Sequence, residues 1–211
     1  MFIIDFDDTI FDTFRWKRER LFAPLERLGI PSEIVQETYT AIRNNPDAPY
    51  THEAHADALA RLGFPREKVK TVLAASLGDD FHTFVFDDAR SFLEMLKGMG
   101  QSLILLTLGD PAFQRAKQEK SGLLDFFDHA YFPDRHKERA MDPIISMCNL
   151  DESMWFINDG VAQTQKVQVA CPKIIPIMKV SPAHDRDNYV QSGFPYFDTL
   201  TEIGEYIKAH V

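Results

Sequence analysis

The chain has 211 residues, of which 45% are hydrophobic and 26% charged, and its formal net charge is −9. This length is enough for one substantial core, or for a core and a small appended unit. Nucleic acid and anionic membranes are bound largely by Lys and Arg side chains that neutralise phosphate. The negative charge therefore argues against both as partners.

The sequence shows no export signal and no disulfide pattern. The N-terminus has no basic stretch followed by a small-residue cleavage site, and no apolar run approaches the roughly 20 residues that cross a bilayer. Cys148 and Cys171 form neither a CxxC pair nor a metal-ligand spacing, which favours reduced thiols. We expect a cytoplasmic protein, and nothing in the sequence decides between a monomer and a homodimer.

The first ten residues, MFIIDFDDTI, place an apolar run directly before a cluster of carboxylates. Phe2–Ile4 is short and continuous, as in a buried parallel strand, and Asp5, Asp7 and Asp8 follow it. A carboxylate beside a buried strand is costly unless a cation or hydrogen bonds compensate it. The cluster therefore raises the question of what compensates it.

A long helical block follows this first strand. From about residue 14 to residue 86, helical segments are punctuated by LGIPSE, NNPDAP, LGFPRE and LGDD, and none of them reads as a buried strand. The sequence on either side of the block has the pattern of one sheet. We therefore expect residues 14–87 to form a helical domain inserted into a core made of residues 1–13 and 88–211.

Further short apolar runs follow in the second part of the core. Each is preceded by helical periodicity or helix punctuation, an alternation that is typical of an α/β fold with a doubly wound parallel sheet. Asp110 and Pro111 are suited to the start of a helix after the first of these runs. The predicted strands are Leu103–Leu106, Ala130–Phe132, Trp155–Ile157 and Ile174–Met178.

Polar side chains stand where these runs end. Ligands of an open parallel sheet gather beyond the carboxyl ends of its strands, so these positions are the candidates for chemistry. Asp5 and Asp7 follow the first run, Thr107 the second and Asp159 the fourth, and Lys137 lies slightly beyond the third. We expect a carboxylate pair, a hydroxyl, an ammonium group and another carboxylate to converge on one rim.

This set resembles the motifs of the haloacid dehalogenase-like hydrolase superfamily, most of whose members are magnesium-dependent phosphatases. DFDDT resembles its D-x-D-x-T signature, Thr107 and Lys137 resemble the second and third motifs, and FINDG at 156–160 resembles the fourth. The segment TLGDPAFQRAKQEKSGLLDFFDHAYF resembles the stretch between the second and third motifs in members with a helical cap. The resemblance implies a Rossmann-like core with an inserted helical cap of the C1 type.

The resemblance also implies a role for each motif in phosphoryl transfer. Asp5 would attack phosphorus and form an aspartyl-phosphate, and Asp7 would give a proton to the leaving oxygen and then take one from water. Thr107, the neighbouring backbone N–H groups around Leu108, and Lys137 would bind phosphate oxygens. In the alternative interpretation, Lys137 is an ordinary surface charge of the loop PDRHKER.

Magnesium is the cofactor that the resemblance implies, held by Asp5, Asp159 and the backbone carbonyl of Asp7. Members of the superfamily usually carry a further acidic residue four or five positions after the fourth-motif aspartate, and here these positions are Gln163 and Thr164. This departure predicts weaker metal affinity or activity without abolishing either.

A second departure precedes the fourth-motif aspartate, where Asn158 occupies a place that is commonly glycine in the superfamily.

Outside the motifs, Arg15 and Trp16 lie where the inserted block leaves the core, so they are candidates for substrate recognition, with a solvated helix face as the simpler interpretation. Asp8 is outside the signature and is expected to be a helix-start or surface charge.

The histidines of THEAHAD, His52 and His55, lack the HExxH spacing, and we interpret them as surface residues near a helix start instead of metal ligands. We therefore predict a magnesium-dependent phosphomonoester hydrolase for a small phosphorylated metabolite. A phosphomutase or a 2-haloacid dehalogenase of the same superfamily is an alternative, although Asp7 argues against the dehalogenase. A non-catalytic protein that uses the fold to bind a ligand or partner is a further alternative, because the acid usually found at position 163 or 164 is missing.

Overall fold

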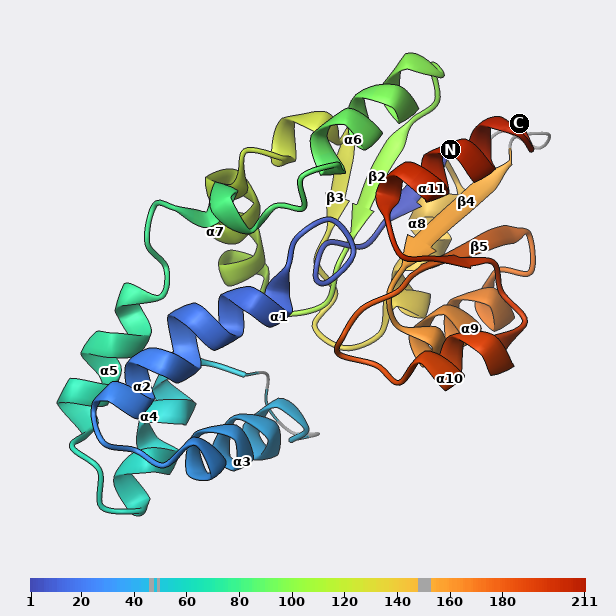
Figure 1. The fold of residues 1–211 in the computed structure, drawn as a ribbon. Helices are drawn as coiled ribbons and strands as arrows, with labels where there is room; N and C mark the ends of the chain where they lie inside the picture. Colours follow the sequence, from blue (N-terminus) through green and yellow to red (C-terminus); the bar gives the residue numbers. More distant parts are fainter. Residues whose placement is uncertain (46–47, 49, 148–152) are drawn as a thin grey trace. The chain divides into compact units, whose positions relative to one another are not determined.

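The computed structural model describes residues 1–45, 48, 50–147 and 153–211. The chain forms two compact units, which are described separately below (Figure 1). Met1–Asp12 and Val85–Val211 make up the first unit, and Thr13–Phe84 makes up the second. Cys148, one of the two cysteines considered above, lies outside the described residues, whereas Cys171 is buried in the first unit.

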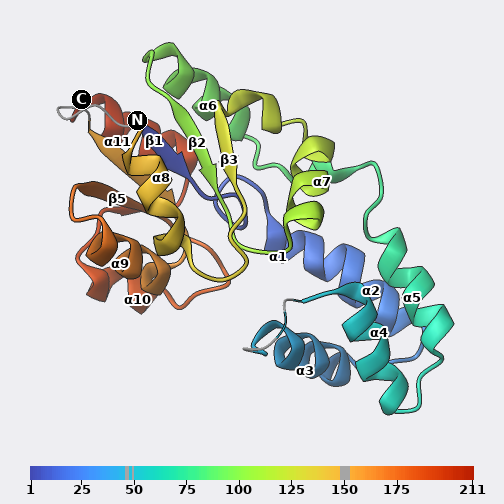
Figure 2. The same ribbon diagram turned by 180° about the vertical axis from the view of Figure 1, so that it is seen from behind.

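A six-stranded parallel sheet lies at the centre of the first unit, with the strand order β3-β2-β1-β4-β5-β6 (Figures 1 and 2). Winding starts at the central β1, proceeds outward to β3, and then resumes on the other side from β4. This is the Rossmann-like order, and it confirms the predicted fold class. The strands are β1 (Phe2–Ile4), β2 (Leu103–Leu106), β3 (His129–Tyr131), β4 (Met154–Asn158), β5 (Ile174–Lys179) and β6 (Tyr196–Phe197).

The edge strand β6 is the one strand in the described residues that the sequence did not predict. Two residues are too few to show an alternating or continuous apolar pattern. The strand forms because β5 presents unpaired backbone groups: the Met178 N–H donates to the Pro195 carbonyl at 2.8 Å, and the Val180 N–H donates to the Phe197 carbonyl at 2.8 Å. Its existence therefore depends on the neighbouring strand.

Helices cover both faces of the sheet. Successive side chains of a strand point to opposite faces, and Ile3, Ile104 and Phe156 pack with residues of α8 (Met141–Ile145) and α9 (Val161–Ala170) in one buried cluster. On the opposite face, α6 (Ala89–Gly98) packs against α11 (Leu200–Lys208) (Figures 1 and 2). The remaining helices of this unit are α7 (Pro111–Ser121) and α10 (Arg186–Ser192), with short 3-10 turns at Leu124–Phe126 and Lys137–Ala140.

The second unit is helical throughout its described residues. A nearly continuous helical stretch runs through α1 (Thr13–Trp16), a π-helical segment (Lys17–Phe22) and α2 (Ala23–Arg27), and is followed by α3 (Ser32–Arg43), α4 (His52–Arg61), α5 (Arg66–Ala75) and a 3-10 turn (Phe81–Phe84). Apolar side chains from these helices are completely buried and form the core of the unit, among them Leu25, Val35, Leu59, Val69 and Leu73. No helix in the described part of the chain is long and apolar enough to cross a membrane.

A buried histidine joins two helices of this second unit. The two ring nitrogens of His55 lie 3.2 Å from the Thr38 hydroxyl and 3.0 Å from the Tyr50 hydroxyl. Burial lowers the pKa of His55 to about 4, and the neighbouring His52 adds to this effect. His55 is therefore a neutral hydrogen-bonding group of the interior at pH 7, and the surface position expected for it from the sequence is wrong.

We predict that His55 makes the fold sensitive to acid. A histidine whose pKa is depressed in the folded state stabilises it above the unfolded pKa of about 6.5, and this contribution is lost as the pH falls towards 4. Replacing His55 with Leu should therefore cost more thermal stability at pH 7.5 than at pH 4.5, as measured by circular dichroism. The exposed His82, changed to Leu, is the control; an equal cost of His55→Leu at both pH values would contradict the prediction.

Candidate active site

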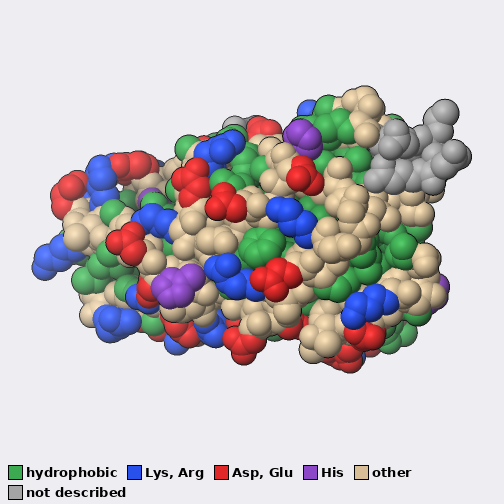
Figure 3. All heavy atoms as spheres, turned by 90° about the horizontal axis from the view of Figure 1, so that it is seen from above, with side chains coloured by type: hydrophobic (Ala, Val, Ile, Leu, Met, Phe, Trp, Pro, Cys, Tyr) green, Lys and Arg blue, Asp and Glu red, His purple; other side chains and the backbone are tan. Residues whose placement is uncertain are grey.

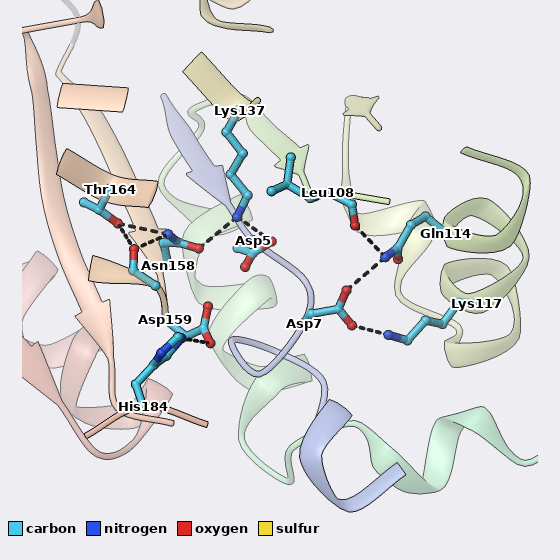
Figure 4. Close-up of polar contacts among 11 residues, drawn as sticks. Asp5, Asp7, Leu108, Gln114, Lys117, Lys137, Asn158, Asp159, Thr164 and His184 are labelled. Carbon is cyan, nitrogen blue, oxygen red and sulfur yellow. Dashed lines mark hydrogen bonds and ion pairs between the residues drawn. The ribbon is translucent and has the colours of Figure 1, made fainter. Parts of the chain in front are cut away.

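The carboxyl ends of the central strands bring the predicted residues to one rim of the sheet (Figure 4). Asp5 follows β1, Thr107 follows β2 and Asp159 follows β4, and all three are buried. Lys137 begins the 3-10 turn Lys137–Ala140, and its side chain is also buried. Parallel strands end at the same edge, so residues far apart in the sequence meet there.

A buried ion pair lies at the centre of this rim. The Lys137 ammonium is 2.8 Å from an Asp5 carboxylate oxygen, and the two residues are only 2% and 4% exposed. Burial raises the pKa of Asp5 to about 7; Lys137 opposes this rise, and the nearby carboxylates of Asp159 and Asp7 add to it. The pocket therefore holds more negative charge than one lysine neutralises, an environment that favours a cation.

Asn158 supports the lysine from the other side. Its side-chain oxygen accepts a 2.9 Å hydrogen bond from Lys137, and its amide group donates to the Gly160 carbonyl at 3.0 Å and to the Thr164 hydroxyl at 2.9 Å (Figure 4). The Thr164 hydroxyl in turn donates to the Gly160 carbonyl. Both departures that the sequence showed at these positions thus belong to one network, which orients Lys137 without an acidic residue at 163 or 164.

The hydroxyl of Thr107 is completely buried and has no hydrogen-bond partner among the described residues. A buried hydroxyl without a partner costs about 1 to 3 kcal/mol, and a ligand oxygen would relieve that cost. The backbone of the same residue is held by the sheet, because its N–H donates to the Tyr131 carbonyl at 3.2 Å. Thr107 therefore offers a fixed donor to a ligand at this rim.

Asp7 turns its carboxylate towards α7 (Figure 4). One oxygen forms an ion pair with Lys117, and the other accepts a 2.9 Å hydrogen bond from the Gln114 amide, which also donates to the Leu108 carbonyl at 2.8 Å. Gln114 and Lys117 were not predicted from the sequence. The available signal was the polar spacing of Gln114, Lys117, Gln118 and Ser121, which are the buried residues of α7.

Two carboxylates and one main-chain carbonyl are available for a metal ion. Asp5 and Asp159 would provide oxygen ligands of the kind that Mg²⁺ prefers. Burial is the main cause of the raised pKa of Asp5, and the charge of Asp159 adds to it. Among the described residues, no three His, Cys, Asp or Glu side chains form a metal-binding group. His184, which the sequence did not indicate, lies 3.3 Å from Asp159.

The remaining candidates lie outside this cluster. Trp16 is buried in the second unit, where its indole N–H donates to the Ser76 carbonyl, and the Arg15 guanidinium donates to the Thr83 carbonyl. A role of these two residues in substrate recognition remains a prediction. The surface position expected for Asp8 is wrong: the residue is buried in a tight turn with φ 56°, and its N–H donates to the Phe11 carbonyl.

The sequence model of a family described as haloacid dehalogenase-like hydrolase matches residues 1–147. Among solved structures, the L-2-haloacid dehalogenase from Xanthobacter autotrophicus is 14% identical with a TM-score of 0.65, and the alignment covers 100% of this chain and 98% of that one. A search of curated protein sequences found no match.

Two further similar structures bear provisional names. A beta-phosphoglucomutase from Thermotoga maritima is 18% identical with a TM-score of 0.73, covering 100% of this chain and 99% of that one. The HAD-hydrolase YfnB from Bacillus subtilis, bound to magnesium, is 17% identical with a TM-score of 0.67, covering 100% and 98%. At these low sequence identities, the structural similarity shows the fold alone.

The fold and the rim of the sheet define a Rossmann-like α/β protein whose strand ends carry a buried carboxylate and lysine pair. The family match extends over most of the chain and includes the strand end at Asp5, the Thr107 strand end and Lys137. The chain belongs to the haloacid dehalogenase-like hydrolases.

We predict that removing the central carboxylate stabilises the protein without metal. A carboxyl group whose pKa is raised on folding stabilises the fold below its unfolded pKa of 3.8, and this contribution is lost as the pH rises towards 7. Asp5→Asn should therefore raise the melting temperature in EDTA more at pH 8 than at pH 4. The exposed Asp142, changed to Asn, is the control, and a lower melting temperature of Asp5→Asn at pH 8 would contradict the prediction.

Proposed function

We propose that this chain is a magnesium-dependent phosphomonoester hydrolase that acts through an aspartyl-phosphate on Asp5. The observation that carries the proposal is the buried pair of Asp5 and Lys137 beside the unpartnered hydroxyl of Thr107. A phosphoryl group placed between them would meet a nucleophile, a cation and a hydroxyl donor. These are the groups that phosphoryl transfer needs, because its catalysis is mainly positioning and charge stabilisation.

Each half of the reaction uses the same residues. The Asp5 carboxylate attacks phosphorus, the bond from phosphorus to the leaving oxygen breaks, and Asp7 gives its proton to that oxygen. Water then attacks the aspartyl-phosphate, Asp7 takes the proton from that water, and the bond between Asp5 and phosphorus breaks. Thr107 and Lys137 hold the phosphate oxygens during both steps, and Lys137 keeps its orientation through Asn158.

Asp5, Asp159 and the backbone carbonyl of Asp7 would hold the magnesium ion, which supplies positive charge against the phosphate oxygens. The clustered carboxylates support this assignment, because a cation would offset the burial and the neighbouring negative charges that raise the pKa of Asp5. The magnesium bound to the similar structure from Bacillus subtilis is consistent with it.

A small phosphorylated metabolite is the proposed substrate class. The helical second unit would act as a cap that carries recognition residues, with Arg15 and Trp16 as the candidates named from the sequence. Acidic and basic side chains alternate on the face drawn in Figure 3, and the chain carries a net charge of −9. Both observations favour a small substrate over a nucleic acid.

The first test is the hydrolysis of p-nitrophenyl phosphate with Mg²⁺ and with EDTA. We expect release of p-nitrophenol with Mg²⁺ and at least a thousandfold loss in Asp5→Asn, because the nucleophile is removed while the shape is kept. Asp142→Asn, an exposed change in α8, is the matched control. Normal hydrolysis by Asp5→Asn would refute the assigned nucleophile.

The same preparation separates the related activities. Chloride release from a 2-chlorocarboxylic acid without metal would indicate the dehalogenase reaction, and transfer of phosphate within a sugar phosphate without free phosphate would indicate a mutase. Magnesium binding without turnover of any of these substrates would favour the non-catalytic alternative.

A second prediction concerns the network around Lys137. Asn158→Leu keeps the approximate volume but removes the acceptor of the lysine, so we expect kcat/KM for p-nitrophenyl phosphate to fall by about ten- to a hundredfold, the effect of one hydrogen bond to a charged group. The exposed Asn188 of α10, changed to Leu, should leave kcat/KM within about twofold. Wild-type kinetics in Asn158→Leu would remove the orienting role of Asn158.

A further inference from the structure

We propose that Lys117 is a positioning residue that, together with Gln114, holds the Asp7 carboxylate where it exchanges protons with the leaving group. The inference rests on the proposed function and adds two residues of α7 to it. Both residues contact the side chain of Asp7. Lys117 would act through Asp7 and without touching the substrate.

Lys117 is placed to serve Asp7. Its side chain is 2% exposed, and its ammonium lies 5.3 Å from the centre of the Phe6 ring and 4.7 Å from that of the Phe11 ring while it pairs with an oxygen of Asp7. A buried lysine is costly unless it is paired. The ammonium lies near both rings and pairs with the carboxylate, so this lysine is directed at Asp7 and away from solvent.

Gln114 ties the same carboxylate to the loop after β2. Its amide nitrogen donates to the second oxygen of Asp7 at 2.9 Å and to the carbonyl of Leu108 at 2.8 Å. Leu108 follows Thr107, whose hydroxyl is the proposed donor to the phosphate. Gln114 therefore connects the proton-transfer residue with the loop assigned to phosphate binding.

Gly109 leaves the space that this arrangement needs. Its φ is +139°, and a Cβ built on it would lie 2.9 Å from the Gln114 amide nitrogen. Any larger residue at this position would meet the side chain that bonds Asp7. The loop conformation and the Gln114 contact thus require glycine together.

The two buried lysines of the site have different partners. Lys137 pairs with Asp5 and Asn158 at the centre of the rim, whereas Lys117 pairs with Asp7 on the side of α7 (Figure 4). With both oxygens of Asp7 engaged, the carboxylate has little rotational freedom. Fixed geometry of this kind makes proton transfer efficient, because the Asp7 carboxyl group is already oriented for transfer to the leaving oxygen.

The inference predicts a dependence on the leaving group. Phenyl phosphate and p-nitrophenyl phosphate differ only by a nitro group, but phenoxide is the more basic leaving group and needs its proton more. In Lys117→Met, we expect kcat/KM for phenyl phosphate to fall by about a hundredfold and kcat/KM for p-nitrophenyl phosphate by less than about tenfold. Gln114→Leu should show the same selectivity with a smaller loss, since it leaves the ion pair intact.

Four further variants complete the experiment. Lys120→Met, an exposed change on the same helix, should leave both substrates unaffected, and Lys117→Arg should recover part of the activity on phenyl phosphate. Asp7→Asn should lose more activity on phenyl phosphate than on p-nitrophenyl phosphate, as Lys117→Met does. The double variant that combines Asp7→Asn with Lys117→Met should have a kcat/KM no lower than that of Asp7→Asn alone, because both changes act on one group. Circular dichroism confirms that each variant is folded.

The outcomes are distinct. The positioning role is supported if Lys117→Met selectively lowers kcat/KM for phenyl phosphate in the wild-type background but causes no further loss when Asp7 is already Asn. Equal loss on both substrates in folded Lys117→Met and Gln114→Leu overturns it while the phosphatase stands. If Lys117→Met does not fold, the same comparison of kcat/KM for the two substrates is made with Gln114→Leu and Lys117→Arg. A wild-type protein that hydrolyses neither substrate refutes the proposed function and, with it, the role of Lys117.

Discussion

The interaction on which the site depends is the buried ion pair between Asp5 and Lys137. Asp5 follows the buried strand β1, and its own side chain is buried. Burial and the nearby carboxylates of Asp159 and Asp7 disfavour its negative charge. Lys137 offsets part of that cost, and Asn158 holds the lysine in place. The site is thus left with excess negative charge in a confined space, which is the state expected of a pocket that binds a cation and a phosphate together.

No acidic residue stands at position 163 or 164, and a network from Asn158 at the end of β4 to Thr164 in α9 contacts Lys137 instead. The Asn158 side chain provides an acceptor for Lys137 that a glycine at this position would lack. The Thr164 hydroxyl then fixes the asparagine through its amide group. The two departures from the family pattern therefore act together, and they weaken the argument for a non-catalytic protein, because the orientation of the lysine is preserved by different atoms.

The sheet explains why these contacts form. Parallel strands that end at one edge bring Asp5, Thr107 and Asp159 together although they are far apart along the chain. On one side of the edge, α7 presents a polar face instead of an apolar one, because it packs against the Asp7 carboxylate and the loop at Leu108. The polar face of this helix therefore matches the polar groups that it packs against.

The sequence by itself determined the central strands, the helical character of the second unit and the residues at the strand ends. These features are local, since a short apolar run followed by a polar residue is visible without knowing its neighbours. The contacts of Lys117 and Gln114 with Asp7 were decided by the tertiary structure. They join residues more than 100 positions apart, and they depend on which face of α7 is buried. The short strand β6 also depends on the tertiary structure, because its two residues are held in an extended conformation by pairing with the edge of β5.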